Sequence, residues 1–154
     1  MSAPEWQRLE IDAIALEDLA RIRTFVHDAL VSESAEDVSD AAVLVVDEVC
    51  ANLVMHGYSG GPPGRVRVGV CIEPDMVRLE VEDEGHPFHP DSAPQPDLTA
   101  DIETRHVGGL GWFLVRQLMD ECTYDVGSGF NRLTLAKRRG LSASGAPGNT
   151  TLLR

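Results

Sequence analysis

Basic residues are scarce in this 154-residue sequence, which has 13 lysines and arginines against 25 aspartates and glutamates. The resulting net charge of −12 at pH 7 repels a phosphate backbone, so direct nucleic-acid binding is disfavoured. A basic protein partner would be attracted instead. The simplest consequence of the charge is solubility.

The sequence also lacks a disulfide framework, a metal-binding cysteine pattern and a long apolar run. Its three cysteines, Cys50, Cys71 and Cys122, are widely spaced and form no Cys-x-x-Cys pair. No apolar stretch approaches the ~20 residues that span a bilayer, and the first residues have no basic and apolar regions of the signal-peptide type. We therefore expect a cytoplasmic protein without a membrane partner.

Hydrophobic periodicity predicts one domain at residues 1–139, followed by a Ser/Gly/Ala-rich disordered tail at 140–154. Alternating apolar and polar residues in two central runs predict an antiparallel hairpin with one face in water. The expected elements are a strand at 6–14, helices at 16–30 and 38–56, strands at 65–72 and 76–82, a helix at 110–119, and strands at 122–126 and 132–136.

Two oxygen-bearing side chains interrupt the largely apolar second helix. Glu48 and Asn52 are four residues apart, so they lie on one face of the helix. Oxygen ligands suit Mg²⁺, and a carboxylate one turn away is placed to deprotonate a hydroxyl. A solvated helix face is the simpler interpretation of such a pair alone, although asparagine is a poor helix former.

A carboxylate and a glycine, Asp83 and Gly85, end the first hairpin. A carboxylate at a strand end, beside backbone that can approach closely, is a fixed acceptor for an exocyclic amine such as that of adenine. An ordinary strand-ending turn explains these residues about as well. Residues 83–107 show no periodicity, which is typical of a functional or disordered segment.

A glycine-rich turn precedes the third predicted helix. Glycines at a helix start expose backbone N–H groups where the helix dipole favours anions. The turn fits neither the Walker A pattern nor the dinucleotide Gly-x-Gly-x-x-Gly pattern, so alone it is a weak signal. Its residues are Gly108, Gly109, Leu110 and Gly111.

Taken in order, these features closely resemble the GHKL ATPase superfamily, which has the Bergerat nucleotide-binding fold. The similar stretch covers residues 47–137. Residues 47–58, which end in His-Gly-Tyr, resemble the N-box of the bacterial anti-sigma-factor serine/threonine kinases, while 83–88 and 109–111 resemble their G1 and G2 boxes. The resemblance implies an α/β fold (an α+β two-layer sandwich) with a mixed, largely antiparallel sheet and helices on one face.

The resemblance also implies roles for the matching residues. Asn52 would coordinate Mg²⁺, and Glu48 would be the general base toward a substrate hydroxyl. Asp83 would bind the adenine amine of ATP, with Gly85 letting the backbone approach. The phosphates would be bound by the main chain of Gly108, Gly109, Leu110 and Gly111.

Three residues fall outside the family pattern. Arg105 is assigned to the γ-phosphate only from its position and charge, and a solvent-exposed lid arginine explains it equally well. Pro87 stands where many relatives have the second glycine of the G1 box. Asn131 replaces a hydroxyl residue often found near the last strand, which leaves one polar contact open.

The implied function is an ATP-dependent protein serine/threonine kinase that is also an anti-sigma factor. It would phosphorylate an anti-anti-sigma protein of the STAS type and sequester an RNA polymerase sigma factor. Relatives commonly dimerise, which leaves a homodimer open. Two alternatives remain: a non-catalytic nucleotide-binding module that binds a sigma factor or another regulator, and a detached histidine-kinase catalytic domain. The His-Gly-Tyr ending and the short lid argue against the last.

Overall fold

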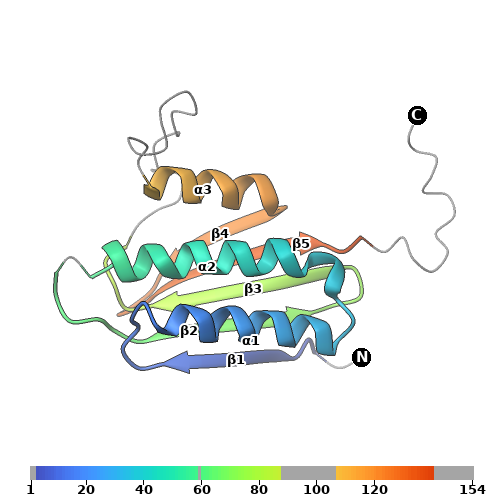
Figure 1. The fold of residues 1–154 in the computed structure, drawn as a ribbon, viewed down its shortest axis with the longest axis horizontal. Helices are drawn as coiled ribbons and strands as arrows, with labels where there is room; N and C mark the ends of the chain where they lie inside the picture. Colours follow the sequence, from blue (N-terminus) through green and yellow to red (C-terminus); the bar gives the residue numbers. More distant parts are fainter. Residues whose placement is uncertain (1–2, 59, 88–106, 141–154) are drawn as a thin grey trace, which may run out of the picture.

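Within the described part of the chain, three α-helices cover one face of an open five-stranded sheet (Figure 1). The computed structural model describes residues 3–58, 60–87 and 107–140, with the backbone alone for 107–111. No helix in these ranges is long and apolar enough to cross a membrane. The elements are β1 (Trp6–Ile11), α1 (Asp18–Ser32), a 3₁₀ turn η1 (Glu36–Val38), α2 (Ser39–His56), β2 (Val66–Ile72), β3 (Met76–Asp83), α3 (Val107–Leu118), β4 (Glu121–Val126) and β5 (Asn131–Arg138).

The strand order is β1-β2-β3-β5-β4, and each pair of described neighbours is antiparallel. The two-layer α/β fold is therefore confirmed, while the sheet has no parallel pair among its described strands. The connections explain this, because a parallel pair needs a single crossover element that returns the chain to the same end of the sheet. Here two helices, α1 and α2, lie between β1 and β2. The chain therefore enters β2 at the end of the sheet where it left β1, and the two strands run antiparallel.

The core lies between the sheet and the helices. Alternate residues of the central strands are at most 3% exposed and face the helices, as the periodicity predicted. Residues at helical spacing in α1 and α2 pack against them. The principal members are Ile22, Val26, Val45, Val46, Val68, Val70, Leu79, Val81, Leu133 and Leu135.

The end of the described chain packs against the connection between α1 and α2. Arg139 Nη2 donates to the carbonyl oxygen of Ser34 at 2.7 Å, and the Gly140 N–H donates to Asp37 Oδ2 at 2.8 Å. These contacts hold the two residues that follow β5 in place. The tail predicted at 140–154 lies, from residue 141 on, outside the described residues.

The opposite face of the sheet has a row of alternating charges that crosses all five strands. The row consists of Glu10, Arg67, Glu82, Arg132 and Asp125, each opposite the next in register. Glu82, at the centre, is 8% exposed and accepts hydrogen bonds from Arg67 Nε at 3.0 Å and Arg132 Nε at 2.7 Å. Burial acts to raise the pKa of Glu82, but the hydrogen bonds and charges of the two arginines outweigh it and lower the pKa.

We expect Glu82→Gln to lower the free energy of unfolding by about 1–2 kcal/mol at neutral pH, because two arginines lose a charged partner. The folded-state pKa of Glu82 lies below the unfolded value, so its contribution is present above the unfolded pKa and is lost as the pH falls through the folded pKa. Urea unfolding of the parent and of Glu82→Gln, from neutral pH to a pH below the folded-state pKa of Glu82, measures the difference in the free energy of unfolding. Glu10→Gln, at the exposed end of the same row, is the control, and an equal loss in both variants would contradict the prediction.

Candidate functional site

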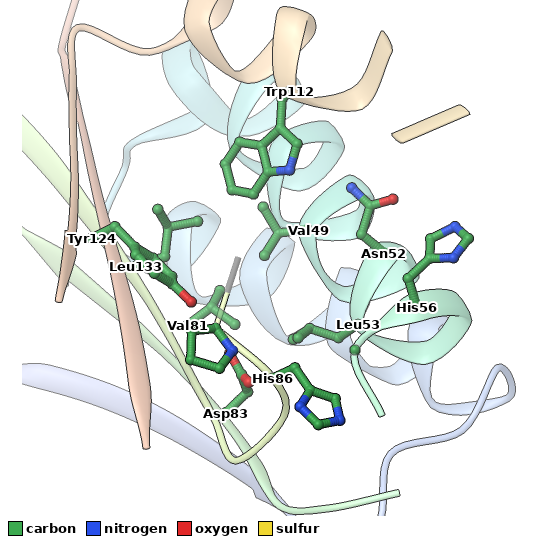
Figure 2. Close-up of a pocket in the computed structure, with 12 residues that line it drawn as sticks. Val49, Asn52, Leu53, His56, Val81, Asp83, His86, Trp112, Tyr124 and Leu133 are labelled. Atoms are coloured by element: carbon green, nitrogen blue, oxygen red, sulfur yellow. The ribbon is translucent and has the colours of Figure 1, made fainter. Parts of the chain in front are cut away.

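A largely apolar cavity of about 220 Å³ lies between α2, α3 and the sheet. Figure 2 shows Trp112 reaching down from α3, with side chains of the strands on one side and of α2 on the other. Pockets that hold whole drug-sized ligands are about 300–1,000 Å³, so this cavity fits a flat ring system rather than a larger molecule. Its apolar walls are Val49, Leu53, Val81, Trp112, Tyr124 and Leu133.

Asp83, the last residue of β3, places a carboxylate at one end of the cavity and is only 7% exposed. Its Oδ1 accepts hydrogen bonds from the Gly85 N–H at 2.7 Å and from Asn131 Nδ2 at 3.1 Å. Burial raises the pKa of Asp83, and these two hydrogen bonds oppose that rise because they stabilise the charged form. Asp83 is thus a buried acceptor in a fixed orientation.

The loop after Asp83 is fastened to the end of α2. The His86 N–H donates to the carbonyl oxygen of Gly57 at 2.8 Å. A Cβ at Gly85 would lie 2.5 Å from that same oxygen, which is closer than a carbon and an oxygen can approach. Only glycine therefore permits this contact between α2 and the strand end.

Asn52 and Glu48 belong to α2. Asn52 lines the cavity, whereas Glu48, one helical turn earlier, is half-buried and is not among the lining residues. Burial, followed by the negative charge of Asp47, raises the pKa of Glu48. Asp47 accepts a hydrogen bond from Arg23 Nη1 at 2.8 Å, which ties this part of α2 to α1. The raised pKa makes the Glu48 carboxylate a better proton acceptor than an exposed glutamate.

The glycine-rich turn lies inside α3, because the helix begins at Val107 and not after the glycine pair as expected. The first backbone N–H groups of a helix have no partner within the helix, so this turn still offers donors. The turn also directly precedes Trp112, which reaches into the cavity. The turn comprises Gly108, Gly109, Leu110 and Gly111, while Arg105 lies outside the described residues and its assignment stays a prediction.

Within the described part of the chain, no three His, Cys, Asp or Glu side chains gather in a way that could hold a metal ion. A metal at this site would therefore depend on few protein ligands. Mg²⁺ binds in that manner, since it keeps several waters and takes most remaining ligands from substrate phosphates. Among the described residues, Asn52 of α2 lines the cavity with an oxygen-bearing side chain, and its role as a ligand stays a prediction.

The structure adds three residues to the site predicted from the sequence. Asn131, which the sequence marks only as a departure from a pattern, contacts Asp83 because the two are opposite each other in register. Trp112 and His86 line the cavity. The start of β5 opposite the end of β3 was the only available signal for Asn131.

Comparison with known sequences places these residues in a described family. A profile of the histidine kinase-like ATPase domain matches residues 13–137. An anti-sigma F factor of Bacillus cytotoxicus is 34% identical over 106 residues, which cover 68% of this chain and 71% of the relative. The anti-sigma F factor of Bacillus thuringiensis is 33% identical over 106 residues, which again cover 68% of this chain and 71% of the relative.

Two solved structures have a similar fold. One contains the RsbU and RsbW domains of a Mycobacterium tuberculosis protein, with a TM-score of 0.61 and 19% identity, covering 86% of this chain and 32% of that one. The other is the histidine kinase domain of a blue-light-activated kinase from Erythrobacter litoralis, with a TM-score of 0.50 and 21% identity, covering 79% of this chain and 59% of that one. At these identities the likeness concerns the fold alone.

Gly85→Ala should destabilise the protein by about 2–3 kcal/mol, because the new methyl group would displace the backbone at Gly57. Thermal or urea unfolding gives the loss. Gly140→Ala is the control, since a Cβ there meets nothing within 4 Å and should change stability by less than about 0.5 kcal/mol. Similar stability of the two variants would show that the contact at Gly57 is not tight.

Proposed function

This chain belongs to the histidine kinase-like ATPase family, and from that premise we propose that it is an ATP-dependent protein serine/threonine kinase that also acts as an anti-sigma factor. The observation that carries the proposal is an apolar cavity lined by a buried acceptor, Asp83, and by Asn52, with Glu48 one helical turn before Asn52 in α2. The relatives named anti-sigma F factor support the regulatory part.

The adenine base of ATP fits the described cavity. Its flat ring would lie between Leu53 and Val49 of α2 on one side and Val81 and Leu133 of the sheet on the other. Its exocyclic amine would donate to Asp83, whose Oδ1 is already held by two donors. Burial of the ring gives affinity, and the buried carboxylate gives orientation.

The phosphates would extend from the cavity toward the first turn of α3. The N–H group of Gly109, which lies in the first turn of α3, and the helix dipole favour negative charge there. Mg²⁺, when bound, would neutralise charge on the transferring phosphoryl group. Asn52 would hold the ion through its side-chain oxygen, with phosphate and water as the other ligands.

Glu48 would accept the proton of the acceptor hydroxyl. The hydroxyl oxygen forms a bond to the γ-phosphorus, the bond from that phosphorus to the bridging oxygen breaks, and ADP leaves. Because the pKa of Glu48 is raised by burial and by Asp47, the carboxylate takes up this proton more readily. Positioning and electrostatics would supply most of the rate.

The acceptor hydroxyl would belong to a serine or threonine of a STAS-type anti-anti-sigma protein. Phosphorylation would place about two negative charges in the interface with an already acidic kinase and so weaken it. The released kinase would then be free to hold a sigma factor.

We expect Glu48→Gln to reduce transfer of labelled phosphate from ATP to a STAS-type protein by at least about a hundredfold, while ADP binding stays unchanged. Transfer by the parent should also fall as the pH falls through the raised pKa of Glu48, because the protonated carboxyl cannot accept a proton. Asp40→Asn, at an exposed position of the same helix, is the control and should behave as the parent.

Full transfer by Glu48→Gln would remove the general-base role. ADP binding without transfer to any STAS-type protein would favour the non-catalytic module. An acid-labile phosphate on the partner would instead indicate transfer to histidine.

Removal of Mg²⁺ should weaken ATP binding by the parent about ten- to hundredfold, since a charged ligand contact is lost. In Asn52→Ala the same removal should change the affinity little, whereas Asn52→Asp keeps an oxygen ligand and should keep the dependence. Calorimetric titration with ATP, with and without Mg²⁺, makes the comparison. Equal Mg²⁺ dependence in Asn52→Ala and the parent would exclude Asn52 as the ligand.

A further inference from the structure

Asn131 closes a ring of hydrogen bonds around Asp83. It is 2% exposed, and its Nδ2 donates both to Asp83 Oδ1 at 3.1 Å and to the carbonyl oxygen of Gly85 at 2.9 Å. The Gly85 N–H completes the ring by donating to the same Asp83 Oδ1 at 2.7 Å. The ring joins the start of β5 to the end of β3 and the residues that follow it.

The ring restricts where Asp83 can carry a proton. A side-chain amide nitrogen and a backbone N–H are donors at every ordinary pH. Both point at Oδ1, so a proton on that oxygen would oppose two donors. Among the described residues, Oδ2 has no hydrogen-bond partner, which leaves it for a ligand in the cavity that Asp83 lines.

We propose that Asn131 sets the base specificity of the cavity, by holding Asp83 as a charged acceptor that takes a 6-amino purine and rejects a 6-oxo purine. This inference rests on the nucleotide-binding function proposed above. Asn131 is therefore a positioning residue, which acts on the ligand through Asp83.

The protonation state of Asp83 Oδ2 decides which of the two purine classes can bind. A charged Oδ2 accepts from an exocyclic amine, but it opposes the carbonyl oxygen of a 6-oxo purine and leaves both groups buried without a donor. A protonated Oδ2 would donate to that carbonyl, and the discrimination would disappear. Burial raises the pKa of Asp83 toward the protonated form, and the hydrogen bond from Asn131 acts against this.

Other titratable groups also face Asp83. Glu84 follows it in the chain, and its charge raises the pKa of Asp83. Cys50 in α2 and Tyr58 just beyond it interact electrostatically with Asp83. His56 and His86 line the same cavity. All are unchanged in variants at position 131, so a comparison between variants at each pH isolates the contribution of Asn131.

Asn131→Thr and Asn131→Val form a matched pair, because the two side chains have nearly the same shape and only threonine has a donor. Affinities for ADP and for inosine diphosphate, which carries a 6-oxo group, are measured by calorimetry from neutral to mildly acidic pH. We expect the parent and Asn131→Thr to prefer ADP by about a hundredfold or more. The preference should be about ten- to hundredfold smaller in Asn131→Val, and more so at lower pH.

Equal preference in the threonine and valine variants, with equal melting temperatures, would overturn the inference. If Asn131→Val does not fold, the pH profile of the parent decides. Its preference for ADP should shrink as the pH falls toward the raised pKa of Asp83, and a flat profile would overturn the inference. A parent that binds neither nucleotide would instead refute nucleotide binding itself, and the inference with it.

Discussion

The contact between the Gly57 carbonyl and the backbone at Gly85 and His86 sets the geometry of the whole site. It joins the end of α2 to the end of β3 with no side chain between them. The cavity-lining end of α2, which carries Asn52, is thereby held close to the buried carboxylate of Asp83 at the end of β3. A fixed spacing between two elements that line one cavity keeps the shape of that cavity constant.

Glu82 and Asp83 are adjacent carboxylates whose pKa values move in opposite directions. They point to opposite faces of the sheet, as successive strand residues must. Two guanidinium groups surround Glu82 and lower its pKa, whereas only neutral donors contact Asp83, and its burial dominates. The two carboxylates differ because of the groups that hydrogen-bond to them and not because of their residue types. Glu82 links strands of the sheet through its arginines, while Asp83 remains available to a ligand.

Local patterns allowed much of the fold to be predicted. The alternation in β2 and β3 correctly assigned their buried faces, and the spacing of Glu48 and Asn52 placed both on one side of α2. Contacts between distant residues were beyond such reasoning. Asn131 meets Asp83 through a register set by the last hairpin, and Trp112 enters the cavity only because of the way α3 packs. Arg105 and the tail lie outside the described residues.

The two tryptophans lie on opposite faces of the sheet. Trp112 is 6% exposed and lines the cavity, whereas Trp6 belongs to β1 at the sheet edge, with the Arg8 guanidinium 5.2 Å from its ring centre. An occupant of the cavity would change the surroundings of the first indole and leave those of the second unchanged. The protein thus has a built-in optical reporter of cavity occupancy together with an internal reference, and neither needs a label.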